Sequence, residues 1–332
     1  MFTILAADAA STAVELTGSS KYEYVLQREA SGVDAELDAV VIDRDRVYAA
    51  GEGGIVLRRT AGTGWVHEPT PTTKRIRALV VATDEVANGA AADAPIFAVG
   101  DGGAVVRRSP DGRWTVEATP TQVDLYDIVS DEGHTYIVGD RGTLLERRAG
   151  TWRAIPTNTD ADLRRFDGQV AIGKGGAIVD CTRWDREQYT LAHMVACVPR
   201  PSPTREDLLA STGDGRHSVW HAYGAGGTLM SAAKRAPIDA TLGEPLADRP
   251  TIRASVENHY STSVDTLATI LVGDAGVMVF VSGPRRVRVE LATAPDLFGV
   301  ASEALDAFAV GARGTIVHLQ TRGVQIPTLS FQ

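Results

Sequence analysis

Apolar residues recur along the chain as short strands that break at a Gly-x-x-Gly turn and resume as a second apolar strand. The phrase occurs seven times, and its clearest copies are AAGEGGIVLRR, AVGDGGAVVRR and IVGDRGTLLERR. The first glycines of the seven copies are Gly51, Gly100, Gly139, Gly173, Gly224, Gly273 and Gly311. The last glycines are Gly54, Gly103, Gly142, Gly176, Gly227, Gly276 and Gly314. Short apolar runs separated by turn residues predict an all-β repeat protein.

The spacing of the repeats identifies the kind of repeat fold. Successive first glycines are 49, 39, 34, 51, 49 and 38 residues apart, an average of about 43, which is the size of one propeller blade. The third repeat shows a complete unit of four strands: DLYDIV, TYIVGD, GTLLERR and TWRAIPT. We designate them A to D from the inside outwards. The sequence therefore predicts one β-propeller domain of four-stranded antiparallel blades over residues 1–332.

We expect both glycines of each turn to serve backbone geometry. A tight link between strands needs positive φ angles, which residues with a Cβ resist. The residues between the glycines vary from Glu-Gly to Asp-Arg to Lys-Gly. This variation argues against equivalent metal or phosphate sites, and we predict no metal site.

Residues 1–32 contain a faded copy of the unit: TILAAD, TAVELTGSS and KYEYVLQ. Asp8 stands where Gly51 stands 43 residues later. This favours eight blades slightly, with the last blade joining the N-terminal strands to a short strand within Leu329–Gln332. The alternative is a seven-bladed ring with the first thirty or so residues packed outside, which would leave three strand-like segments without a sheet.

Composition and charge narrow the environment and the partners. No apolar run is close to the length of a membrane span, about 18 residues. The segment Met1–Ala10 lacks the basic start and the long apolar stretch of a signal peptide. We therefore expect a cytoplasmic protein. The formal charge of −9 argues against nucleic acid as a partner. Cys181 and Cys197 both fall in the fourth repeat; free buried thiols are favoured, and an isolated bridge stays open.

Catalytic signatures are mostly missing from the sequence. Gly168–Lys174 matches G-x-x-x-x-G-K, but Gly175 follows in place of Ser or Thr. His217 and His221 lie on an expected strand, which would place them about 13 Å apart, too far to bind one ion. Pairs of acids that could cleave a glycosidic bond are Asp43/Asp45, Asp124/Asp127, Asp160/Asp162 and Glu206/Asp207. We predict no enzyme activity and no cofactor.

The candidate site is the mouth of the central channel, where the ends of strand A meet. Candidate partner-binding residues there are Arg75, Arg77, Asp124, Tyr126, Arg164, Arg165 and Arg253. His259 and Tyr260 are further candidates, in the loop Glu257–Asp265. We expect this loop to share one face of the ring with the loop Thr83–Pro95, and the loop Val198–Asp207 to lie on the opposite face. Mixed charge and arginine suit protein contacts, although solvated strand ends are the alternative. The arginine pairs Arg58-Arg59, Arg107-Arg108 and Arg147-Arg148 are expected to be solvated.

The repeat unit aVGd-x-G-t-lxRr…G-x-W resembles that of the photosystem II stability and assembly factor-like propellers. Its tryptophans are Trp65, Trp114 and Trp152. The segment Ser109–Trp114, SPDGRW, also resembles a shortened Asp-box of sialidase-type propellers. The resemblance covers nearly the whole chain and implies the fold, with no catalytic residue carried over. We predict a non-catalytic scaffold for a protein partner; the alternative is a carbohydrate-binding or glycoside-cleaving propeller.

Overall fold

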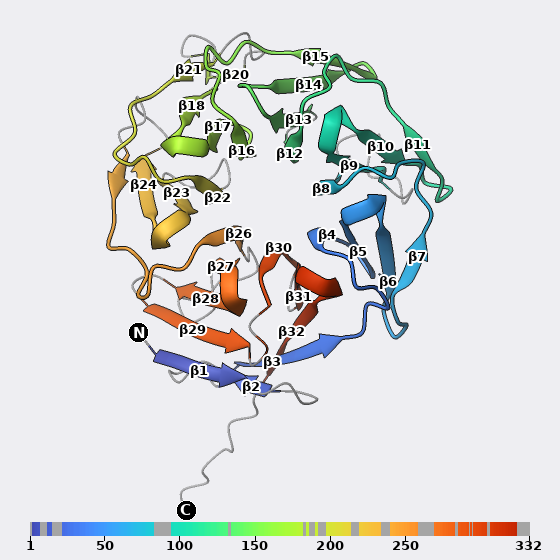
Figure 1. Ribbon diagram of the computed structural model, residues 1–332, viewed down its shortest axis with the longest axis vertical. Helices are drawn as coiled ribbons and strands as arrows, with labels where there is room; N and C mark the ends of the chain where they lie inside the picture. Colours follow the sequence, from blue (N-terminus) through green and yellow to red (C-terminus); the bar gives the residue numbers. More distant parts are fainter. Residues whose placement is uncertain are drawn as a thin grey trace, which may run out of the picture.

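The computed structural model describes residues 2–6, 12–14, 22–82, 94–131, 134–181, 184–185, 190–191, 197–213, 219–233, 240–257, 269–282, 285–291, 293, 295–303 and 306–323. Its strands form a ring of seven antiparallel blades around a central axis (Figure 1). In these residues no helix is long and apolar enough to cross a membrane. The predicted all-β propeller is confirmed.

The first five blades each take four strands in chain order from the channel outwards. Blade 1 consists of β4 (Leu37–Asp43), β5 (Arg46–Gly51), β6 (Val56–Thr60) and β7 (Val66–Glu68), and blade 2 of β8 (Ile76–Val81), β9 (Ile96–Gly100), β10 (Val105–Arg108) and β11 (Trp114–Val116). Blade 3 consists of β12 (Leu125–Asp131), β13 (His134–Gly139), β14 (Leu144–Arg148) and β15 (Thr151–Ala154), and blade 4 of β16 (Leu163–Phe166), β17 (Val170–Gly173), β18 (Ile178–Asp180) and β21 (Val198–Pro199). Blade 5 consists of β22 (Leu208–Thr212), β23 (Val219–Gly224), β24 (Leu229–Ala233) and β25 (Thr241–Leu242). A separate two-stranded sheet, β19 (Trp184–Asp185) and β20 (Thr190–Leu191), precedes β21.

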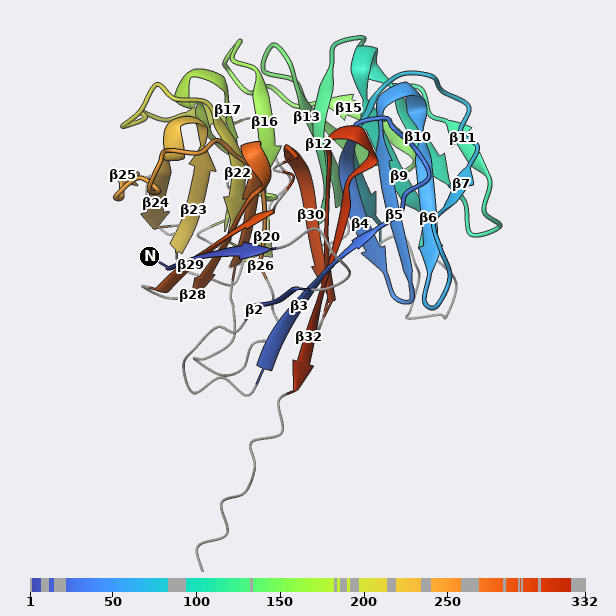
Figure 2. The same cartoon turned by 60° about the horizontal axis from the view of Figure 1, so that its bottom comes forward.

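The last two blades take strands from both ends of the chain. Blade 6 consists of β26 (Ile252–Glu257), β27 (Thr269–Gly273), β28 (Val277–Ser282) and β29 (Arg285–Leu291), with β1 (Phe2–Ala6) added parallel to β29. Blade 7 consists of β30 (Leu297–Glu303), β31 (Asp306–Gly311), β32 (Ile316–Gly323) and β3 (Tyr22–Glu29), with β2 (Thr12–Val14) on its outer edge. Figure 2 shows these N-terminal strands lying beside β29 and β32.

The favoured eighth blade is not formed by the described N-terminal strands. KYEYVLQ is a strand D, as expected, but it belongs to blade 7, where β3 pairs with β32 from Tyr22↔Gly323 to Glu29↔Ile316. The physical reason is that β32 would otherwise present a long open edge. The short closing strand expected within Leu329–Gln332 lies outside the described residues. The ring is therefore closed by strand exchange between the two ends of the chain.

The two glycines of each turn have different structural roles. Six of the first glycines have φ between −171° and −176°, which is extended backbone, so the expected positive φ is wrong for them. Gly51 is instead required by crowding, because a Cβ there would lie 1.9 Å from the carbonyl oxygen of Glu36. The last glycine does have positive φ, as expected: Gly54 has φ +75°, and its Cβ would lie 2.1 Å from the Thr72 carbonyl oxygen.

A Trp–Glu–Arg cluster links neighbouring blades at their outer strands. Glu68 of β7 accepts hydrogen bonds from the next blade, from Trp114 Nε1 at 3.0 Å and Arg108 Nε at 2.9 Å. Although burial opposes ionisation, these bonds hold the pKa of Glu68 below its usual value. The same cluster recurs at two other junctions, as Glu29 with Trp65 and Arg59 and as Glu117 with Trp152 and Arg147.

The cluster corrects the prediction that the paired arginines are solvated. Arg108 is only 8% exposed, because its guanidinium lies between the Glu68 carboxylate and the Tyr48 ring, 5.2 Å from the ring centroid. Arg148 is exposed, as expected. Trp114 and Trp152 are buried, which fits the blade-packing role expected for the tryptophans.

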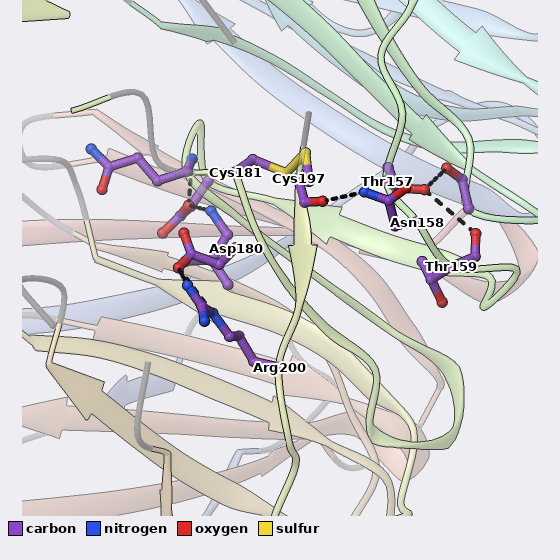
Figure 3. Close-up of a disulfide and its surroundings, with 11 residues drawn as sticks. Thr157, Asn158, Thr159, Asp180, Cys181, Cys197 and Arg200 are labelled. Carbon is purple, nitrogen blue, oxygen red and sulfur yellow. Dashed lines mark hydrogen bonds and ion pairs between the residues drawn. A yellow bond between two sulfur atoms is a disulfide. The ribbon is translucent and has the colours of Figure 1, made fainter. Parts of the chain in front are cut away.

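Cys181 and Cys197 form a disulfide in blade 4, so the preference for free thiols is wrong (Figure 3). Cys181 follows β18 and Cys197 precedes β21, and because these strands are neighbours the two Cα atoms come within 4.3 Å. Around the bridge, Asn158 Nδ2 donates to the Cys197 carbonyl oxygen at 2.8 Å, and Arg200 binds Asp180 at 2.7 Å. The cytoplasmic location stays a prediction.

His318 links the two ends of the chain at the ring closure. Its Nδ1 lies 2.9 Å from Glu29 Oε1 and its Nε2 lies 3.2 Å from Asp306 Oδ1. The ring stacks on Phe308 with the centroids 4.1 Å apart, and Arg59 binds the same Glu29 carboxylate at 2.9 Å. Both nitrogens face carboxylates, so the imidazolium, which donates from both, is the favoured form. Burial lowers the pKa of His318, but the bonds to Asp306 and Glu29 outweigh it and raise the pKa above its usual value.

This raised pKa predicts a pH-dependent stability of the closure. The contribution of His318 is fully present below its unfolded pKa, about 6.5, and is lost as the pH rises through the folded value. We expect His318→Gln to lower the free energy of unfolding by about 1–3 kcal/mol at pH near 6 and by clearly less at pH near 9. Urea denaturation of both proteins across this range measures the difference. An equal loss at both pH values would contradict a charged His318.

Candidate functional site: the channel mouth

Every inner strand, strand A of its blade, has a β-bulge near its first residue. The pairing of strands A and B shifts register at the second residue of strand A in all seven blades. A bulge residue leaves the ladder, and its side chain is redirected. The seven bulge residues are Asp38, Arg77, Tyr126, Arg164, Leu209, Arg253 and Phe298, and all of them line one cavity of about 700 Å³ at the channel mouth.

Most of the candidate residues from the sequence are brought together in this cavity. Its lining includes Arg75, Arg77, Tyr126, Arg164, Arg165 and Arg253. Asp124 lies beside it, with Oδ2 4.0 Å from Arg77 Nη2. His259 and Tyr260 lie outside the described residues. Binding of a partner by these residues stays a prediction.

Three of the bulge residues form an arginine–tyrosine stack, Arg77, Tyr126 and Arg164. The guanidinium carbon of Arg164 lies 3.5 Å from the centroid of the Tyr126 ring, and that of Arg77 lies 4.9 Å from it. Both distances are within the range of cation–π contacts. Blades 2, 3 and 4 thus place two cations on one aromatic ring at the rim of the channel.

The arginines of the cavity differ in how close their carboxylate partners lie. Arg75 makes three hydrogen bonds of 2.6–2.7 Å to Asp38 and Glu36. The others are closely paired as well: Arg77 with Asp101 at 2.5 Å, Arg165 with Asp127 at 3.0 Å, and Arg253 with Asp274.

Arg164 is the exception among these arginines. Its nearest recorded carboxylate oxygens, on Asp140 and Asp162, are both 3.5 Å away. Burial and the neighbouring charge of Arg77 lower the pKa of the Arg164 guanidinium. A cation that is half-buried and weakly paired has unused hydrogen-bonding capacity for an anion.

The aspartates that precede strand A have a structural role that the sequence analysis missed. Asp124 Oδ1 accepts the Gly102 N–H of the preceding blade at 2.8 Å. The same contact recurs from Asp162 to Arg141, from Asp207 to Gly175 and from Asp296 to Ala275. Asp124 therefore links two neighbouring blades, in addition to being a candidate for partner binding. The signal was present in the sequence as an acidic residue directly before the first apolar residue of strand A.

The lining of the cavity also includes apolar residues, among them Ala39, Val40, Leu79, Ile128 and Val300, beside the ion pair of Arg165 and Asp127. Sequence analysis missed Leu209 and Phe298, which add apolar surface to the rim on the side of blades 5 and 7. The site thus combines apolar residues with an arginine-rich and aromatic rim, an arrangement that suits a ligand carrying both an apolar group and an anion.

The comparisons with known proteins concern the fold. No family model matches the chain, and no curated protein matches its sequence. The structure is similar to virginiamycin B lyase from Staphylococcus aureus, at 11% identity over 90% of this chain and 99% of the lyase, with a TM-score of 0.72. It is also similar to YCF48 bound to D1 peptide, at 13% identity over 92% of this chain and 97% of YCF48, with a TM-score of 0.64.

YCF48 from Cyanidioschyzon merolae matches at 13% identity over 89% of this chain and 98% of that one, with a TM-score of 0.63. At such low identities the likeness shows the fold alone. The fold-level resemblance to the photosystem II assembly-factor propellers is thereby confirmed. The structures that share this fold include both an enzyme and a peptide-bound protein.

Proposed function

We propose that this protein is a non-catalytic scaffold that binds a protein partner at the channel mouth. The observation that carries the proposal is the arginine–tyrosine stack, in which Arg164 is half-buried, stacked on Tyr126 and 3.5 Å from its nearest carboxylates. A carboxylate of the partner would complete the hydrogen bonding of this guanidinium. Charge-assisted bonds of this kind are about twice as strong as neutral ones.

The composition of the rim supports a protein partner. Arginine and aromatic residues dominate the binding energy of protein interfaces when they lie in a partly desolvated pocket. Tyr126 and Phe298 supply the aromatic surface, and Val40, Leu79 and Ile128 add apolar surface for a side chain of the partner. The partner segment that fits best carries an acidic residue next to an apolar one. YCF48, which shares the fold, is bound to a D1 peptide, and this supports a peptide segment as the ligand.

We expect Arg164→Ala to lower the affinity for the partner at least tenfold, since about 1.5–3 kcal/mol is typical of a hydrogen bond to a charged group. The partner is first isolated by affinity capture of the tagged protein from its source cells, and its binding to each variant is then measured by calorimetry. Arg113→Ala is the matched control, because Arg113 is exposed in the turn before β11. Unchanged affinity of the Arg164→Ala variant, at an unchanged melting temperature, would contradict the proposal.

An enzyme acting on a small molecule is the second candidate. The cavity volume of about 700 Å³ lies within the range of small-molecule sites, about 300–1,000 Å³, and a lyase shares the fold. Quinupristin is present in the structure of a catalytically inactive variant of virginiamycin B lyase. Incubation with quinupristin and with a panel of reporter glycosides, followed by mass spectrometry, tests this candidate. Product formation that is lost in Arg164→Ala would replace the scaffold proposal.

A further inference from the structure

The seam between blades 1 and 2 differs from its counterparts at the position before strand A. In four blades this position is an aspartate that bonds to the turn of the preceding blade. In blade 2 the position holds Arg75, whose guanidinium turns inward to Asp38 and Glu36 at 2.6–2.7 Å. In the described part of the chain, no carboxylate bridge to the turn of blade 1 takes the place of the aspartate link.

An open cleft lies at this seam. It has a volume of about 520 Å³ and is lined by Glu52, Gly53, Thr73, Lys74, Arg75, Asp101 and Gly102. Arg75 lines both this cleft and the channel-mouth cavity. The two hollows therefore share one wall residue at the seam between blades 1 and 2.

At the seam between blades 7 and 1 the residue before strand A is the acidic Glu36, and at the seam between blades 5 and 6 it is Thr251. At the seam between blades 1 and 2 it is the cation Arg75. A Cβ on Gly53, in the turn at this seam, would meet nothing within 4 Å. The cleft between blades 1 and 2 is therefore open above Gly53.

The surface of the cleft suits a peptide backbone. Gly53 exposes main chain without a side chain, and a Cβ there would meet nothing within 4 Å, so another chain can approach closely. Lys74 Nζ donates to the Gly102 carbonyl oxygen at 3.0 Å, which fixes the ammonium at the wall of the cleft with further donors available. Thr73 adds a hydroxyl group. These donors match the carbonyl oxygens of an extended segment.

We propose that the partner segment bound at the channel mouth leaves the channel as an extended chain through the cleft between blades 1 and 2. This inference rests on the proposed function, because it assigns the path of the same ligand. The segment carries its acidic residue at the arginine–tyrosine stack, and its adjoining residues lie over Gly53 beside Lys74. The protein thus contacts the partner segment both in the channel mouth and in the cleft, and residues of the cleft contribute to the choice of partner.

Gly53→Arg tests the path by filling the cleft. The turn accepts arginine at this position, because Arg141 in blade 3 and Arg313 in blade 7 occupy the equivalent place with φ of 54° and 52°. Gly175→Arg in blade 4 is the matched control. It adds the same charge in the same turn position, where a Cβ also meets nothing within 4 Å, but at a seam where Asp207 bonds to the turn.

The probe is a random dodecapeptide display library selected on the intact protein, with the affinities of the enriched peptides measured by fluorescence anisotropy. We expect Gly53→Arg and Arg164→Ala each to weaken binding at least tenfold and Gly175→Arg to change it less than twofold. Peptides weakened by Arg164→Ala but not by Gly53→Arg would overturn the path and leave the proposed function standing. No enriched peptides, or peptides indifferent to Arg164→Ala, would overturn both.

Discussion

Deletion of residues 1–30 is expected to abolish cooperative folding of the ring, whereas deletion of residues 1–21 leaves it folded. The first deletion removes β3, which is strand D of blade 7 and pairs with β32 along Ile316–Gly323. The second removes β1 and β2, which only extend the outer edges of blades 6 and 7. The two variants therefore separate ring closure from edge protection.

The size of the effect follows from what β3 buries and binds. Val25 and Leu26 are 8% and 4% exposed, and burial of each stabilises the fold by about 1.5–3 kcal/mol. Loss of Glu29 removes the carboxylate that binds the partly buried Arg59 and one of the two that bind the buried His318, which costs about 3–5 kcal/mol for a buried pair. Together these losses are comparable with the whole stability of a typical domain, about 5–15 kcal/mol.

Differential scanning calorimetry and size-exclusion chromatography distinguish the outcomes. The variant lacking residues 1–30 is expected to show no cooperative transition and to aggregate through the open edge of β32. The variant lacking residues 1–21 is expected to keep a single transition within about 5 °C of the full chain, because its losses are confined to edge strands. Equal behaviour of the two variants would show that β3 is dispensable and that the closure lies elsewhere.

The sequence predicted the blades well because their signal is local. Each apolar pair of strands meets at a glycine turn, and the four strands follow one another in the chain. The closure was missed because β3 pairs with residues almost 300 positions away, and no local pattern records such a pairing. One signal was present in the sequence: Glu29 and Glu68 end their strands and Glu117 directly follows its own. All three accept a hydrogen bond from a tryptophan of the next blade.

The binding candidates were located from strand order, but their geometry was not. Arg77, Tyr126 and Arg164 were selected because the ends of strand A meet at the channel, and they do line one cavity. The register shift between strands A and B that redirects them is a feature of the pairing, and the sequence analysis did not predict it. The sequence analysis favoured free thiols because it expected a cytoplasmic protein. The pairing of the neighbouring strands β18 and β21 instead brings Cys181 and Cys197 together.

Gly51→Ala and Gly53→Ala lie in the same turn and are expected to differ widely in stability. A Cβ on Gly51 would lie 1.9 Å from the Glu36 carbonyl oxygen and 2.8 Å from Leu37 Cα. Both are backbone atoms of the inner strand, so the clash cannot be relieved by turning a side chain. We expect a loss of at least about 4 kcal/mol in the free energy of unfolding, a cost that only severe packing or backbone strain produces.

Gly53→Ala is expected to cost only about 1–2 kcal/mol, the price of a left-handed residue with a Cβ. Its φ is +69° with nothing within 4 Å of the added atom, and Ala275 already occupies the equivalent position in blade 6 with φ of 53°. An argument from φ alone predicts the reverse order, because the φ of Gly51 is −176° and any residue can adopt it. Urea denaturation of the two variants therefore decides whether the repeated first glycine is selected for conformational freedom or for the close approach of strands A and B. A larger loss in Gly53→Ala would rule out the close approach as the reason for this glycine.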